Sequence, residues 1–227
     1  MNALSGDGFA ARLWGSIDGI YKRILEHPFI EGLTTGELDR GAFRYYVIQD
    51  ALYLRDYARA LAVCAAKSPT ESDIRMFSEH AAGAITVERE LHESFFADFG
   101  LSEADVTATE MAPTNLAYTS YLLATVYGRP FEEALGAVLP CYWIYWEVGL
   151  ALTEHGSPDP LYRRWIETYG GDEFADVVRA VLAVTDRLGD TLDEPAKERV
   201  QRRFLTTSRY EWMFWDMGYR QEQWPVG

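Results

Sequence analysis

Three polar residues, Asp50, Cys141 and Glu211, occupy helical positions whose neighbours on the same face are apolar. A thiol is a nucleophile, and carboxyl groups give and take protons. A charged carboxylate in a dry interior is costly unless it is paired, so such a residue usually has a partner or a task. For Asp50 or Glu211 considered alone, two roles are equally consistent with the sequence. The side chain could be a structural group that bonds to a tyrosine hydroxyl or a helix end, or it could be a catalytic group.

Cys141 lies in the most unusual stretch of the chain. Pro140 precedes it, and four aromatic residues fall within the next five positions. Pro140 either interrupts a helix or starts one, and in both cases a backbone donor is missing. A free cysteine is more often a small core residue than a reactive one, and when this stretch is considered by itself the core interpretation is favoured for Cys141. Cys64 is also interpreted as a core residue.

Other kinds of site lack their motifs. The sequence has no Gly-rich phosphate loop, no Gly-x-Ser-x-Gly and no CxxC. No histidine has a glutamate three residues before it, which argues against a di-iron bundle site, so we expect no metal. His27 is a candidate axial ligand for haem, although a histidine near a helix C-terminus is the more ordinary interpretation. Cys141 has no histidine nearby in sequence, so its proton is expected to go to a carboxylate or through a tyrosine network.

Composition limits the class of protein. Of the 227 residues, 48% are hydrophobic and 25% charged, as in soluble globular proteins. The net charge of -14 disfavours nucleic acids and anionic membranes as partners. Two cysteines are too few for a disulfide framework, and neither a signal peptide nor a charge-free stretch of membrane length is evident. We therefore expect a cytoplasmic protein.

Apolar residues recur in steps of three and four along the chain, and no stretch alternates with period two. The pattern predicts helices at about 9–24, 39–67, 69–99, 113–128, 130–155, 158–169, 174–184 and 193–218. Polar links are expected after His27-Pro28 and at 101–112, the second with at most one turn. Because there is no linker or repeat, residues 1–227 are expected to form one all-α domain, a compact multi-helix bundle.

Five blocks of sequence carry a family resemblance. They are Phe43-Arg44-Tyr45-Tyr46 with Asp50 and Tyr53; Pro113-Thr114 with Tyr118-Thr119-Ser120; Leu139 to Tyr145; Tyr169 ahead of Phe174; and Tyr210-Glu211 with Phe214-Trp215. Over nearly its whole length the chain resembles the TenA/thiaminase II family, the aminopyrimidine aminohydrolases of thiamin salvage. The Pro-Cys-Tyr-Trp block with its later tyrosine and glutamate is the specific part.

The resemblance implies a role for each matching residue. Cys141 would be the nucleophile, and Glu211 the acid/base. Asp50 would contact the amino side of a pyrimidine and help to place the thiol, while Tyr145 would orient the cysteine. The expected pocket-lining residues are Tyr53, Tyr118 and Tyr169. The family fold is that of haem oxygenase without haem, no cofactor is implied, and members are usually homotetramers.

The implied reaction is hydrolysis of 4-amino-5-aminomethyl-2-methylpyrimidine to the hydroxymethyl compound, with thiamin as a slower substrate. A flat pyrimidine between tyrosines would account for part of the aromatic content, which is 14% of the chain. The alternative is a non-catalytic pyrimidine-binding or regulatory protein on the same scaffold. Direct DNA binding is disfavoured by the net charge and by the lack of a basic recognition helix.

Overall fold

The computed structural model describes residues 8–226, apart from the side chains of residues 87–93 and 103. In this part of the chain every regular element is a helix, which confirms the all-α prediction. The elements are α1 (Phe9–Gly15), α2 (Asp18–Leu25), α3 (Pro28–Thr35), α4 (Arg40–Lys67), α5 (Glu71–Phe99), α6 (Glu103–Ala108), α7 (Pro113–Gly128), α8 (Phe131–Thr153), α9 (Pro160–Gly170), α10 (Asp172–Gly189) and α11 (Glu194–Arg220).

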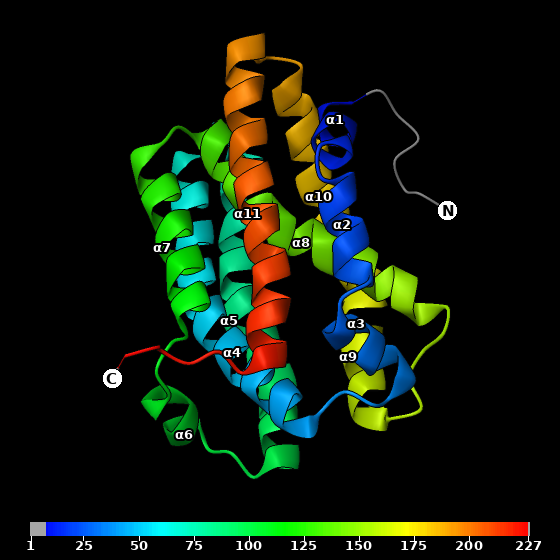
Figure 1. Ribbon diagram of the computed structural model, residues 1–227. Coiled ribbons are helices and arrows are strands. Elements are labelled where there is room, and N and C mark those ends of the chain that lie inside the picture. Colours follow the sequence, from blue (N-terminus) through cyan, green and yellow to red (C-terminus); the bar gives the residue numbers. More distant parts are fainter. Residues whose placement is uncertain (1–7, 227) are drawn as a thin grey trace.

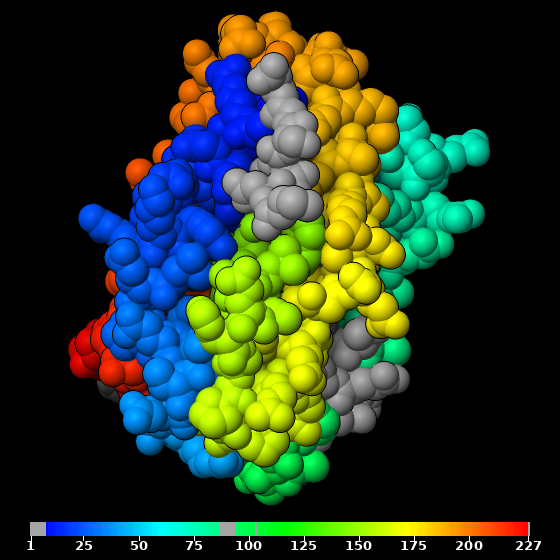
Figure 2. All heavy atoms as spheres, turned by 90° about the vertical axis from the view of Figure 1, so that its right-hand side faces the viewer, coloured from blue at the N-terminus to red at the C-terminus, as the bar shows by residue number. Residues whose placement is uncertain are grey.

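Helix α8 is the centre of the bundle. It packs against α11 and α9 above all, with α7 on one side and α10 on the other (Figure 1). It is long and apolar enough to cross a membrane, but 83% of its most apolar stretch is buried by the other helices, as in the core helix of a globular bundle. Its C-terminal end reaches the surface between the N-terminal helices and the pair α9 and α10 (Figure 2).

Pro140 lies inside α8 and does not divide it. Proline has no N–H, so the carbonyl of Gly136 one turn earlier has no helical donor. The helix continues because its neighbours bury it on nearly every side. Cys141 and Tyr145 therefore project from one continuous helix, one turn apart.

The N-terminal region differs from the prediction of one helix and a polar link. Helix α1 ends at Gly15, where the backbone changes to three-residue turns: the Ser16 N–H and hydroxyl both donate to the Leu13 carbonyl, at 3.0 and 2.6 Å. Residues 28–35, expected as a link, form α3. Pro28 takes its first position, where proline is favoured, so it starts a helix and does not simply end one.

His27 caps α3. Its Nδ1 accepts the Phe29 N–H at 3.1 Å, and its Nε2 lies 3.6 Å from the Asp216 carboxylate. Both ring nitrogens are thus engaged, which leaves neither one available as an axial ligand to haem in this conformation.

Two smaller differences concern helix starts. Helix α5 begins at Glu71 with Thr70 as its cap, so Pro69 precedes the cap and is not the first helical residue. The link at 101–112 contains α6, whose start is fixed by a reciprocal capping box between Ser102 and Asp105. The long helix expected from Asp39 to Lys67 is confirmed as α4, with Asp39 as its N-cap.

Candidate active site

The two carboxylates singled out in the sequence, Asp50 on α4 and Glu211 on α11, are both buried, with 5% and 2% of their surface exposed. Glu211 has a direct partner on a third helix, because the Tyr118 hydroxyl of α7 donates to its Oε1 at 2.5 Å. One hydrogen bond replaces only part of the hydration that a charged carboxylate loses on burial, so burial disfavours the charged form. Its proton affinity should therefore be high.

Burial raises the pKa of Glu211 to about 8. The hydrogen bond from Tyr118 acts in the opposite direction, and the nearby charge of Asp50 adds to the rise. At neutral pH the Glu211 carboxyl group is therefore mostly protonated, and it is poised to act as a general acid.

This shift predicts a pH-dependent stability. Because the pKa of Glu211 rises from 4.5 to about 8 on folding, the folded chain holds a proton that the unfolded chain releases between these values. The contribution of Glu211 to the free energy of unfolding is therefore fully present below pH 4.5. It falls by roughly 1.4 kcal/mol per pH unit as the pH rises to about 8. Glu211→Gln lacks the titrating group, so its stability relative to wild type should increase over this window in denaturant titrations. A difference that stays constant with pH would contradict the assignment.

Cys141 is half-buried on α8, beside the tyrosines of α4 and α7. Burial is the main cause that raises the pKa of Tyr53 and of Tyr118 well above the ordinary value, and both Cys141 and Glu211 add to each rise. The thiol and the carboxyl group thus act on the same pair of tyrosines. The hydroxyl of Tyr53 is buried, and its close polar neighbour is Tyr118, whose pKa it lowers by hydrogen bonding, so a bound ligand could give it a better partner.

Tyr145 and Tyr169 lie in a second aromatic group. Their ring centroids are 4.9 Å apart, and Trp215 lies 4.9 Å from Tyr145 on the α11 side. The Tyr145 hydroxyl is 3.2 Å from that of Tyr46, which also accepts the Trp165 indole N–H at 3.3 Å. After burial and Tyr46, the charges of Asp50 and Glu211 raise the pKa of Tyr145, which links the two groups.

Helix α7 is fixed over α4 by buried amides. The Gln49 side chain donates to the Glu110 carbonyl at 3.0 Å and accepts the Ala112 N–H at 2.9 Å. Asn115 donates to the backbone and side-chain oxygens of Gln49 at 2.8 and 3.0 Å. Thr114 lies in the first turn of α7, and the side chain of Glu222, just after α11, accepts its backbone N–H at 2.9 Å. These contacts set the position of Tyr118, one turn further along.

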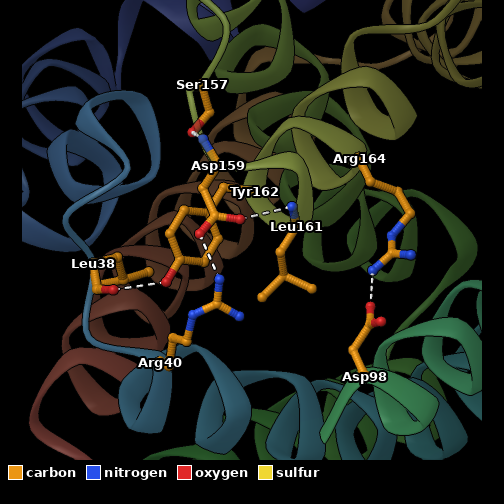
Figure 3. A network of polar contacts seen from close by, with 8 residues as sticks. All are labelled: Leu38, Arg40, Asp98, Ser157, Asp159, Leu161, Tyr162 and Arg164. Carbon is orange, nitrogen blue, oxygen red and sulfur yellow. Dashed lines mark hydrogen bonds and ion pairs between the residues drawn. The ribbon is translucent and has the colours of Figure 1, made fainter.

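Helix α9, which carries Tyr169, is held by the contacts drawn in Figure 3. Asp159 caps the helix through the Leu161 N–H and forms an ion pair with Arg40 at 2.8 Å. The Tyr162 hydroxyl donates to the Leu38 carbonyl at 2.6 Å. An ion pair between Arg164 and Asp98 adds a contact to α5.

Helices α8 and α9 also touch directly, at Gly149 and Gly170. A Cβ atom at Gly149 would lie 2.5 Å from both the Gly170 nitrogen and the Tyr169 carbonyl carbon. Only glycine allows this approach. Because Gly149 is one turn beyond Tyr145, the crossing sets the spacing between Tyr145 and Tyr169.

Gly149→Ala should therefore push α9 away and destabilise the protein by about 1–3 kcal/mol, as overpacking does. The matched control is Gly83→Ala, since no atom lies within 4 Å of a Cβ built at Gly83 in α5. That change should stabilise the helix by roughly 0.5–1 kcal/mol. Thermal unfolding of both variants measures the difference, and equal effects would rule out the close crossing.

All seven site residues predicted from the sequence belong to this region. They are Asp50, Tyr53, Tyr118, Cys141, Tyr145, Tyr169 and Glu211, and they come from α4, α7, α8, α9 and α11. Sequence reasoning did not single out three further residues there: Tyr57, Tyr142 and His80. Tyr57 could have been found, because it lies two turns after Asp50 on the same face of α4. The Tyr142 hydroxyl lies 3.1 Å from His80 Nδ1, a pairing across 62 residues that no local pattern indicates.

The second cysteine, Cys64, has a different environment from Cys141. It is fully buried, and burial raises its pKa to about 12, which fits the interpretation as a core residue. Among the residues whose side chains are described, no group of three or more His, Cys, Asp or Glu is arranged to hold a metal ion.

The sequence is similar to a known protein family over most of its length. The sequence profile described as the TENA/THI-4/PQQC family matches residues 14–221. An aminopyrimidine aminohydrolase of Halalkalibacterium halodurans is 35% identical over 218 residues, which cover 95% of this chain and 97% of that protein.

Solved structures agree with the fold. A TenA homologue from P. horikoshii OT3 superposes with a TM-score of 0.87 and 32% identity, and the match covers 94% of this chain and 99% of that one. A domain of unknown function with a heme oxygenase-like fold from Shewanella denitrificans has a TM-score of 0.73 at 14% identity, with 93% and 92% of the two chains covered. The second match concerns the fold alone and confirms the expected haem-oxygenase-like architecture.

Proposed function

The chain belongs to the TENA/THI-4/PQQC family, and from this premise we propose that it is an aminopyrimidine aminohydrolase. The proposed reaction converts 4-amino-5-aminomethyl-2-methylpyrimidine and water into the 5-hydroxymethyl compound and ammonia. Thiamin, with its thiazole as leaving group, is the proposed slower substrate. The setting would be thiamin salvage.

One observation supports the proposal more than any other. A thiol on α8 and a buried carboxyl group on α11 act on the same two tyrosines, and burial raises the pKa of the carboxyl group to about 8. Covalent addition to a pyrimidine needs a nucleophile and, at the same moment, a proton for the ring nitrogen. Cys141 and Glu211 would supply these two groups.

In the proposed first step, the Cys141 sulfur bonds to the ring carbon beside the one that bears the aminomethyl group. Glu211 gives its proton to the neighbouring ring nitrogen, and Asp50 accepts the thiol proton. The exocyclic carbon–nitrogen bond then breaks, and the electron pair leaves with the amine, which takes the proton from Asp50 and departs as ammonia.

In the second step, the oxygen of a water molecule bonds to the exocyclic carbon. One water proton returns to the sulfur as the carbon–sulfur bond breaks, and Glu211 recovers the proton of the ring nitrogen. Water enters, ammonia leaves, and the protein returns to its starting state. Glu211 thus acts first as an acid and then as a base.

The aromatic residues would bind the ring. A flat pyrimidine fits between tyrosine faces, and Tyr145 and Tyr169, with ring centroids 4.9 Å apart, would form one wall. Tyr53 would turn its buried hydroxyl group to the ligand. Residues 1–227 would act as one domain, in a cytoplasmic homotetramer.

A non-catalytic pyrimidine-binding protein is the second candidate, because the same walls would bind the ring without reaction. Incubating the protein with the aminomethylpyrimidine separates the two functions. Formation of the hydroxymethylpyrimidine with one equivalent of ammonia is expected. Tight binding without product would favour the binding protein, and neither binding nor product would exclude both.

A further inference from the structure

Tyr57 of α4 has a fixed relation to the turn of α8 that carries the thiol. It is buried, and its hydroxyl donates to the Val138 carbonyl oxygen at 2.9 Å. Val138 lies three residues before Cys141, with Pro140 between them. Side chains in a helix tilt back toward its N-terminus, so the side chain of Cys141 lies near the carbonyl group three residues earlier. This hydrogen bond therefore brings the Tyr57 oxygen beside Cys141.

The thiol and the Tyr57 hydroxyl interact directly. After burial, the charge of Cys141 is the largest cause that raises the pKa of Tyr57, and a hydrogen bond between the two side chains adds to it. The charge of Cys141 also raises the pKa of Tyr53 and of Tyr118, but a hydrogen bond to Cys141 is among the main causes only for Tyr57. Tyr57 is therefore the partner of the sulfur within this group of tyrosines.

The ring of Tyr57 cannot move far. Tyr53 stacks on it with ring centroids 5.5 Å apart and planes at 20°, and the ring of Tyr142 packs edge-on at 5.7 Å. Tyr142 is itself held by the contact between its hydroxyl and His80 Nδ1 at 3.1 Å. With the ring clamped, the remaining freedom is rotation of the hydroxyl hydrogen about the C–O bond.

We propose that Tyr57 positions the Cys141 nucleophile and stabilises it when it ionises. While Cys141 is a thiol, the Tyr57 hydrogen lies on the Val138 carbonyl, and the S–H stays available to Asp50, which accepts its proton in the proposed reaction. When the sulfur becomes anionic, the hydrogen turns from the carbonyl to the sulfur. A hydrogen bond to an anion is about twice as strong as one between neutral groups, and S–H is a weak donor, so the exchange favours the thiolate.

The matched test compares Tyr57→Phe with Tyr21→Phe. Tyr21 also donates from its hydroxyl to a backbone carbonyl of α8, that of Glu147, at 3.0 Å. Each variant loses one hydrogen bond of the same kind to the same helix, but only Tyr57 contacts the thiol. Two quantities are measured: the rate of Cys141 alkylation by iodoacetamide as a function of pH, with the labelled cysteine identified by peptide mass spectrometry, and kcat and KM for the aminomethylpyrimidine.

In Tyr57→Phe, the midpoint of the alkylation profile should move to higher pH, and kcat should fall about tenfold to a hundredfold, the usual cost of a lost hydrogen bond to a charged group, with little change in KM. Tyr21→Phe should leave both unchanged. The kcat part rests on the proposed function, whereas the alkylation part does not. A shifted profile in a protein that hydrolyses no pyrimidine would reject the function and support the Tyr57 assignment. A Tyr57→Phe profile equal to those of wild type and Tyr21→Phe would overturn the assignment.

Discussion

Cys141→Ser is expected to lower the turnover of the aminomethylpyrimidine by roughly 10³-fold or more, because a serine hydroxyl is a far weaker acid than a thiol and a carboxylate base such as Asp50 activates it poorly. The variant should still fold, because Cys141 is only half-buried and serine is only slightly smaller than cysteine. Release of ammonia under saturating substrate measures the loss.

The matched control is Cys64→Ala. Cys64 is fully buried and has no role in the proposed reaction, so its replacement should reduce stability but leave kcat near the wild-type value at a temperature where the protein is folded. If Cys141→Ser turns over as fast as wild type, covalent catalysis by this residue is wrong. An equal loss in both variants would point to damage to the fold.

Glu211→Gln is expected to keep ligand binding and to lose turnover by about 10²–10⁴-fold, the usual contribution of a general acid–base group. Glutamine preserves the size of the side chain and can still accept the hydrogen bond from Tyr118, but it cannot give a proton to the ring. Binding measured by calorimetry, together with kcat, separates the two effects.

Glu147 provides the control for burial. It is a second buried glutamate whose pKa burial raises, and it sits on α8 with a hydrogen bond from the Trp143 indole, away from the tyrosines around Cys141. Glu147→Gln should leave turnover within a fewfold of wild type. A Glu211→Gln variant with the wild-type rate would remove Glu211 from the proposed mechanism.

The helical periodicity is enough to predict the all-α fold and its long helices, because their starts carry clear signals: aspartate caps at α4 and α11, and a proline in the first turn of α7. It failed at the N-terminus. There, the pattern predicts a helix end at His27-Pro28, whereas proline also favours the first helical position, and Pro28 begins α3. Local signals of this kind are ambiguous until the packing partners of the segment are known.

The sequence indicates candidate residues for the site but not the contacts between them. Buried carboxyl groups and a thiol on apolar faces are visible in a sequence, since they interrupt an otherwise regular pattern. The short hydrogen bond from Tyr118 to Glu211 joins residues 93 positions apart, and the contact of Gly149 with Gly170 depends on how two helices cross. Likewise, the sequence places Tyr57 on the same face as Asp50, but it does not show which of the fourteen tyrosines contacts Cys141. Such pairings are properties of the packed bundle.

A crystal structure of the Cys141→Ser variant with bound aminomethylpyrimidine would test the central claim most directly, because the variant should hold the substrate without turning it over. The account predicts a ring carbon in contact with the residue 141 side chain, a ring nitrogen hydrogen bonded to Glu211, and tyrosine rings on the faces of the pyrimidine. A pyrimidine bound elsewhere, or bound with Glu211 beyond hydrogen-bonding reach of the ring, would contradict it.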